Sequence, residues 1–406
     1  TAVSVVILDG EVEIKTVDCA GIAKGSYTVD IPTTELPKTK SLTWKVEVKG
    51  ESVESPTKQS DVFKFYLPYG LDCDVDPESD YLGNWYVIEA AKHNATGYMS
   101  DNVQRGLYAF DATLTGIKNK NGTYGFTGGV YVGASKYNNS TSSSSPTYVN
   151  LYRVVTSGGR VFIGRFEPDQ APIVEANPGD LDANFTEVIA AGKRVASIDA
   201  YGRGENLRLV MLDTDLNIHE YDLGTAKSIS GVSRTIDKDG LEFYRNDGTI
   251  IYDNEGEFWL NQHRGTATKT CPTIAHLSTE NGFDYNNVDD EISHDKCSNS
   301  GIAINPAGTE LAVVGAGERT LTIYSISNDG SGHISLTQKH KIYHASDIGK
   351  NHTALAYDYA GNLYVANRSA ETVTFYAMPY SGMVSTPCAS KYAFELQEVA
   401  PTTYTV

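Results

Sequence analysis

The chain has 406 residues, of which 40% are hydrophobic and 21% charged, and its formal net charge is −18 at pH 7. Phosphate recognition needs clustered lysine and arginine, so we expect no nucleic-acid partner for so acidic a chain. No run of about 18 apolar residues occurs, so we also predict no transmembrane segment.

The first residues predict a small β module. Glu11–Lys15, Tyr27–Ile31 and Leu42–Val48 alternate strictly between polar and apolar residues, which is typical of strands with one wet face. A polar, proline-bearing stretch follows at Glu51–Ser60, which indicates a linker. We therefore predict an immunoglobulin-like β-sandwich at residues 1–62 and a separate domain at residues 63–406.

The second domain contains a recurring turn of the form Asx-x-x-Gly between two strand-like runs. The clearest copies begin at Asp253, Asn305 and Asp358, at intervals of 52 and 53 residues, and looser copies begin at Thr156 and Asp199. A repeat of this length made of short strands is the signature of a β-propeller, with about four strands in each blade. With a first turn near Asp74, the copies predict six blades.

Two further segments belong to this expected ring. The serine-rich tract Asn138–Ser145 lies in an insertion and is expected to be a loop. The alternating run Tyr392–Leu396 is expected to add the outer strand of the last blade, which would remove an open sheet edge.

Five cysteines occur in the chain, and none forms a C-x-x-C pair, so a zinc site is not expected. Cys271 and Cys297 flank one loop region and are candidates for a disulfide. Cys73 and Cys388 are a second candidate pair, at the point where the ring closes. Buried free thiols are the alternative for all of them.

The Asx residues of the repeat suggest a ring of metal ligands, but turn formation explains them better. An Asx side chain at the start of a tight turn accepts hydrogen bonds from the backbone that follows, and the closing glycine supplies a positive φ. Asp199, Asp253, Asn305 and Asp358 are assigned to such turns. Of the residues expected near the central channel, only Asp72, Arg153 and Asp199 carry charge, while the other inner strands are apolar or small.

The loops that follow the second strand of each blade converge on one face of the ring, and they are polar and mixed in charge. A rigid scaffold that presents such loops commonly carries a binding site. The residues predicted to bind there are Glu89, His93, Arg165, Gln262, His263, Arg264, Arg319, Asn367 and Arg368. Asp213 with Asp215, and Asp289 with Asp290, are weaker candidates for calcium ligands.

The segments Pro68–Asp72, Asn84–Val87, Gly106–Ala112 and Asp358–Ala366 resemble the propeller proteins exported by Bacteroidetes-type bacteria. That group is similar to NHL and YncE-like propellers and often carries a FlgD-type immunoglobulin-like module in front. The resemblance covers about residues 40–397. It implies export to the periplasm or the outer-membrane surface, with a lipid anchor on the precursor, and the start of the chain at Thr1 agrees with a processed protein.

Two functions follow from these observations. We favour a non-enzymatic binding protein for a glycan or a surface protein, without a cofactor, because no nucleophile elbow, zinc-protease motif or phosphate-binding loop occurs in the sequence. The alternative is a calcium-dependent lactonase-type hydrolase, since six-bladed rings that resemble this one host such chemistry. It would require several inward carboxylates sharing one metal ion.

Overall fold

The structure is a computed structural model of the whole chain. It describes residues 2–9, 12–19, 42–49, 68–89, 106–112, 114–127, 151–165, 171–189, 195–213, 215, 217–236, 248–261, 274–278, 282–287, 301–315, 320–328, 334–343, 352–367, 372–376 and 385–387. The chain divides into two compact units, whose main parts are Thr1–Val62 and Phe63–Met378. Among the described residues, no helix is long and apolar enough to cross a membrane.

The first unit contains a three-stranded antiparallel sheet in the order β2-β1-β3. Its strands are β1 (Ala2–Asp9), β2 (Val12–Cys19) and β3 (Leu42–Lys49), with a β-bulge between Ile7 and Leu8. The strands expected from the alternation at Glu11–Lys15 and Leu42–Val48 are therefore present, whereas Tyr27–Ile31 lies outside the described residues. The immunoglobulin-like class of this module stays a prediction.

The second unit contains five four-stranded antiparallel sheets, each with its strands in chain order from one edge to the other. Their strands are β7 (Leu151–Ser157), β8 (Arg160–Arg165), β9 (Ile173–Ala176) and β10 (Thr186–Ile189); β11 (Val195–Tyr201), β12 (Arg208–Asp213), β13 (Ile218–Asp222) and β14 (Arg234–Ile236); β15 (Thr249–Tyr252), β16 (Phe258–Asn261), β17 (Ile274–Ser278) and β18 (Gly282–Asn287); β19 (Ile302–Ile304), β20 (Glu310–Gly315), β21 (Thr320–Asn328) and β22 (Ile334–Tyr343); β23 (His352–Tyr357), β24 (Leu363–Asn367), β25 (Thr372–Tyr376) and β26 (Ser385–Pro387).

A three-stranded sheet, β4-β5-β6, lies beside these five. It consists of β4 (Pro68–Cys73), β5 (Trp85–Glu89) and β6 (Gly106–Phe110). The outer edge of β6 is partly covered by the segment that follows it, because Ile117 N donates to Ala109 O and Phe126 N donates to Leu107 O.

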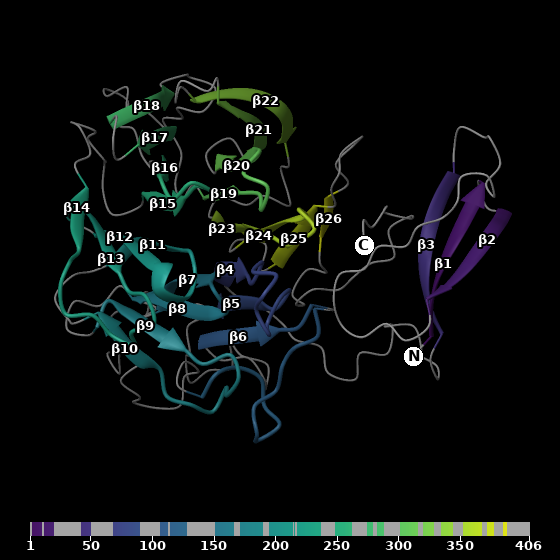
Figure 1. Cartoon of the computed structure of the whole chain (residues 1–406), viewed down its shortest axis with the longest axis horizontal. Helices are drawn as coiled ribbons and strands as arrows, with labels where there is room; N and C mark the ends of the chain where they lie inside the picture. Colours follow the sequence, from purple (N-terminus) through teal and green to yellow (C-terminus); the bar gives the residue numbers. More distant parts are fainter. Residues whose placement is uncertain are drawn as a thin grey trace, which may run out of the picture. The chain divides into compact units, whose positions relative to one another are not determined.

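The first strand of each sheet lies innermost, and the sheets are arranged around a centre (Figure 1). Neighbouring first strands pack against each other in the order β4, β7, β11, β15, β19 and β23, and β23 packs against β4 again. The closing contact is reinforced by Trp85 and Tyr364, whose ring centroids are 3.9 Å apart. The second unit therefore folds as an all-β propeller with five four-stranded blades and the sheet β4-β5-β6.

The apolar core lies between the sheets rather than in one central cluster. Large side chains on the second strands are fully buried, among them Trp85, Phe162 and Trp259. In the last blade the outermost described strand is β26, at Ser385–Pro387, whereas the expected outer strand Tyr392–Leu396 lies outside the described residues.

The recurring turns form as the sequence predicts at three positions. Asp253 Oδ1 accepts hydrogen bonds from Glu255 N and Glu257 N at 2.8 Å each. Asn305 Oδ1 accepts from Thr309 N at 2.8 Å, and Asp358 Oδ1 accepts from Asn362 N at 2.8 Å. The closing glycines have positive φ angles, at Gly256 (82°), Gly308 (70°) and Gly361 (83°).

The assignment of Asp199 to this column of turns is wrong. Asp199 lies inside β11, two residues before the strand ends at Tyr201, and its Oδ2 accepts a hydrogen bond from Tyr252 N on β15 at 2.7 Å. The Asx residue of each true turn directly follows its first strand, as Asp253 follows β15. Asp199 therefore bridges two blades instead of shaping a turn.

The predicted pairing of Cys73 with Cys388 is also wrong. Cys73 has a free thiol, is 1% exposed and contacts the carbonyl oxygen of Asp74 through its Sγ at 3.7 Å. Burial raises the pKa of this thiol well above its usual value, so it is not a reactive thiolate. Cys271, Cys297 and Cys388 lie outside the described residues, and the pairing of the first two stays a prediction.

Candidate ligand-binding cavity

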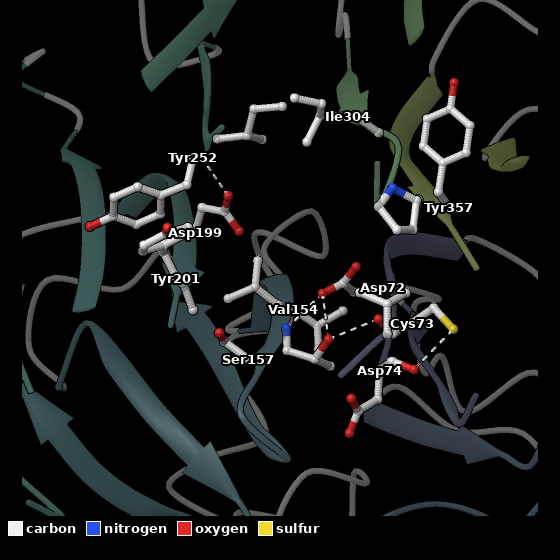
Figure 2. Close-up of a pocket in the computed structure, with 18 of the residues that line it drawn as sticks. Asp72, Cys73, Asp74, Val154, Ser157, Asp199, Tyr201, Tyr252, Ile304 and Tyr357 are labelled. Atoms are coloured by element: carbon white, nitrogen blue, oxygen red, sulfur yellow. Dashed lines mark hydrogen bonds between the residues drawn. The ribbon is translucent and has the colours of Figure 1, made fainter. Parts of the chain in front are cut away.

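A cavity of about 640 Å³ lies at the centre of the ring (Figure 2). It is lined by the first strands β4, β7, β11, β15, β19 and β23, from their middle to the turns that follow them. A volume of this size accommodates a small molecule or a few sugar units. The backbone around it is fixed by the packing of the blades, so the lining side chains are held in place before any ligand binds.

The side chains in the middle of the cavity wall differ between its two halves. Asp72, Arg153 and Asp199 come from three consecutive first strands, β4, β7 and β11. The facing strands β15, β19 and β23 contribute small or aliphatic side chains at the corresponding register, namely Ile251, Ala303 and Ala356. The three charged residues expected near the channel thus line the cavity and share one side of it.

Asp72 is held by the neighbouring blade. Its Oδ2 accepts hydrogen bonds from Thr156 N at 2.6 Å and from Thr156 Oγ1 at 3.1 Å. Asp72 is partly buried and lines the cavity. Burial and the nearby Asp199 carboxylate raise its pKa to about 8 from the usual 3.8, against the opposing effect of the hydrogen bonds.

Asp199 occupies the equivalent place two blades further on. Its Oδ2 accepts the hydrogen bond from Tyr252 N of the next first strand, as Asp72 accepts one from Thr156. Burial raises the pKa of Asp199 to about 7, while the backbone hydrogen bonds partly offset that effect. In both residues the second carboxyl oxygen points away from this interstrand bond (Figure 2).

The other carboxylates of the lining are already used by the local structure. Asp74 accepts hydrogen bonds from Asp76 N at 3.0 Å and from Ser79 Oγ at 2.6 Å. Asp253 shapes its turn and also pairs through Oδ2 with His276 Nε2 at 2.8 Å. Among the lining aspartates, Asp72 and Asp199 are the two that neither shape a turn nor form an ion pair with a described residue.

The mouth of the cavity on the turn side carries a charged rim. Arg203 forms ion pairs with Asp76 at 3.5 Å and with Glu78. Tyr359 is 46% exposed and lines the cavity from the turn after β23. The rings of Tyr252 and Tyr201 instead pack against each other with centroids 5.4 Å apart, and Tyr252 Oη donates to Glu220.

Of the predicted binding residues, the three that the structure describes do not line this cavity. Glu89 and Arg165 end the second strands β5 and β8, pair with the starts of the neighbouring first strands, and are 0% and 1% exposed. Arg165 Nε donates to Ala171 O at 2.6 Å. Asn367 ends β24. The remaining predicted residues lie outside the described part: His93, Gln262, His263, Arg264, Arg319 and Arg368.

The calcium candidate at Asp213 has a structural role. Its Oδ1 accepts hydrogen bonds from Asp215 N and Asn217 N at 2.9 Å each, and its Oδ2 pairs with His219 Nε2 at 2.9 Å. Asp213 is therefore committed to the turn between β12 and β13. Within the described ranges no group of three or more His, Cys, Asp or Glu side chains is placed to hold a metal ion, and Asp289 and Asp290 lie outside those ranges.

Comparison with known proteins shows no family for this chain. No protein-family model matches the chain, and no curated protein matches it. Among solved structures, the propeller domain of Cps50 (Swd1) from Myceliophteria thermophila is 9% identical, with 82% of this chain and 90% of that chain covered and a TM-score of 0.49.

Two bacterial structures are similar to a comparable degree. A protein of unknown function from Bacteroides thetaiotaomicron is 11% identical, with 91% of this chain and 89% of that chain covered and a TM-score of 0.45. A putative 6-phosphogluconolactonase from Bacteroides fragilis is 12% identical, with 80% and 85% covered and a TM-score of 0.43. Because one fold hosts many activities, these likenesses assign no function.

Proposed function

We propose that this chain is a non-enzymatic binding protein that holds a small glycan in the central cavity. The observation that supports this proposal is the cavity of about 640 Å³, which has Asp72 and Asp199 on one side and Ile251, Ala303 and Ala356 on the other. A sugar has the matching chemistry, since its hydroxyl groups exchange hydrogen bonds with carboxyl groups and the C–H face of its ring packs on apolar atoms. A carboxyl group with a pKa near neutrality both donates and accepts such bonds.

The finer features of the molecule are part of this proposal. The sheet β4-β5-β6 would count as a sixth blade, because β4 lies between β23 and β7 in the ring of first strands. The first unit would be an immunoglobulin-like module. Export to the periplasm or outer-membrane surface, with a lipid anchor, and a second partner such as a surface protein are proposals that derive from the resemblance to exported propellers.

A glycan array followed by isothermal titration calorimetry tests the proposal. The double variant Asp72→Asn, Asp199→Asn keeps an oxygen acceptor for each interstrand bond but removes both carboxylates, and we expect it to bind a hit at least tenfold more weakly. Asp222→Asn is the matched control, because Asp222 is an exposed carboxylate at the end of β13. An array without hits would refute glycan binding.

The same titration locates the site. The sequence predicts binding by the loops after the second strands, so a variant with His263→Ala and Arg264→Ala is compared with the cavity variant. If only the loop variant loses affinity, the glycan binds on the face predicted from the sequence and the central cavity is not the site.

A second candidate function is hydrolysis, and the observation that favours it is the pair of carboxyl groups with pKa values near 8 and 7 in one cavity. Such values suit general acid–base catalysis at neutral pH. The calcium-dependent lactonase would additionally need its metal ligands from residues outside the described part. Turnover of a lactone or ester substrate that stops on chelation would replace the binding proposal by the enzyme.

A further inference from the structure

We propose that the ligand of the central cavity carries a protonated amine, which binds between Asp72 and Asp199, and that its uncharged part lies against Ile251, Ala303 and Ala356. This inference rests on the proposed binding function and names the ligand class: a small amine-bearing molecule such as an amino sugar, rather than a neutral or acidic glycan. The inference rests on where the carboxyl groups, their hydrogen bonds and the aliphatic side chains lie around one cavity.

The charge balance of the pair is the first step. Asp72 and Asp199 lie on strands β4 and β11, which flank β7, and they are close enough for the Asp199 charge to raise the pKa of Asp72. Neither carboxylate forms an ion pair with a described residue, because each is held by backbone and hydroxyl donors only. A cation between the two carboxyl groups would stabilise their ionised forms, which burial and mutual repulsion otherwise disfavour.

The geometry of the hydrogen bonds is the second step. Each carboxylate uses Oδ2 for the neighbouring blade, and its other oxygen points away from that bond (Figure 2). An ammonium group has three N–H donors and no acceptor. It can donate to more than one carboxylate oxygen at a time, whereas a sugar hydroxyl has a single donor.

The opposite wall of the cavity is the third step. Ile251, Ala303 and Ala356 offer no hydrogen-bonding side-chain atoms, and all three line the cavity. A molecule with a charged end and an uncharged body matches the carboxyl pair on one side of the cavity and these three side chains on the other.

The other charged groups that line the cavity are compatible with this assignment. Asp74 and Asp253 are engaged in their own turns, and Arg203 is paired with Asp76 and Glu78 at the mouth. Arg153 lies on β7 between the two carboxylates in the ring, and it contributes to the pKa shift of neither Asp72 nor Asp199. Aspartates outnumber arginines among the lining residues, so the formal charge of the lining is negative.

Calorimetry with a matched pair of probes tests the inference. The probes are a tetramer of glucosamine and its fully N-acetylated counterpart, titrated into the full chain at pH 7. We expect the amine form to bind at least tenfold more tightly, and we expect this preference to disappear in Asp72→Asn, Asp199→Asn while Asp222→Asn keeps it. A preference that is absent from the parent, or that survives in the double variant, overturns the inference.

Proton release is an independent readout that a purely structural role would not change. Because Asp72 is largely protonated at pH 7 in the unliganded protein, an ammonium ligand must displace a proton from the pair. Titrations of hexylamine, whose amine is fully protonated at pH 7, in two buffers of different ionisation enthalpy should therefore show proton release. Uptake of protons, or no exchange, contradicts the assigned ion pair.

The same experiments separate this inference from the proposed function. If the acetylated tetramer binds as well as the amine form, the cavity binds glycans and the amine site is wrong. If no glycan binds, simple amines such as hexylamine are titrated. Binding of hexylamine that the double variant abolishes supports the amine site and refutes the glycan, and failure of hexylamine refutes both.

Discussion

Replacement of Asp72 by asparagine should make the folded protein less sensitive to alkaline pH. The carboxyl group of Asp72 has a pKa of about 8 in the fold against 3.8 in the unfolded chain. Between these values the folded state holds a proton that the unfolded state has lost, so the free energy of unfolding falls as the pH rises. Above pH 8 both states are ionised and the loss is complete.

The size of the effect follows from the same values. Each pH unit between the two pKa values costs about 1.4 kcal/mol, so the parent should lose about 2 kcal/mol through Asp72 alone between pH 6 and pH 8. Asp199, whose pKa is about 7, should add about 1 kcal/mol over the same interval. Asparagine keeps an oxygen to accept the hydrogen bond from Thr156 N, so the variant should fold without this penalty.

Urea denaturation at pH 6 and pH 8, followed by tryptophan fluorescence, measures the difference. Titrating groups that do not interact with Asp72 contribute equally to the parent and the variant, so the comparison reports Asp72 together with its coupling to Asp199. We expect the loss between the two pH values to be smaller in Asp72→Asn than in the parent, and Asp222→Asn to behave like the parent. Equal losses in Asp72→Asn and the parent would show that Asp72 is ionised at neutral pH in the fold.

Two further predictions concern the frame around the cavity. Gly256→Ala should cost about 1 kcal/mol more than Gly361→Ala in thermal or urea unfolding. Both glycines have φ near +80°, but only at Gly256 would the new Cβ displace a neighbour, the guanidinium of Arg208, which donates a hydrogen bond to Glu220. Arg160→Lys should cost about 1–2 kcal/mol in the same assay, because Arg160 binds Glu175 through two contacts of 2.7 Å and also donates to two backbone carbonyls of the next blade. An unchanged midpoint for Arg160→Lys would show that these bonds add nothing net.

The propeller fold was predictable because the turn motif, the strands beside it and the repetition of both along the chain indicate the same fold. A turn that needs an Asx acceptor at its start and a positive φ at its end leaves a strong mark in the sequence, and the same mark recurs at Asp253, Asn305 and Asp358. Short strands rich in aromatic and β-branched residues lie on both sides of it. Such agreement between levels is what makes a repeat architecture readable.

The role of Asp199 was not predictable from the same pattern. An aspartate three residues before a glycine looks like the start of a turn, but β11 continues to Tyr201 and the chain turns at Gly202 and the short 3-10 helix Gly204–Asn206. What decides the role of Asp199 is a backbone N–H on another strand, 53 residues away. A local motif contains no information on such a partner.

The position of the cavity along the channel was also missed. Loops that follow the second strands were expected to carry the site because they are polar, yet Glu89 and Arg165 are buried at the ends of their strands. Their polarity reflects bonds inside the fold, such as the one from Arg165 Nε to Ala171 O. Polar composition alone does not separate a residue that faces a ligand from one that holds a strand end in place.

The two cavity carboxylates show how a structural requirement leaves a chemical group available. First strands of neighbouring blades belong to different sheets, so their facing backbone N–H groups find no ladder partner, and buried donors must be satisfied. Asp72 and Asp199 supply that acceptor to Thr156 and Tyr252, and Ser197 Oγ does the same for Ile250 N at 3.2 Å. A serine hydroxyl is enough for the bond, whereas an aspartate adds a second oxygen and a negative charge. The need for a backbone acceptor therefore explains a polar side chain at these positions. It does not require a carboxylate, whose charge is available to bind a ligand.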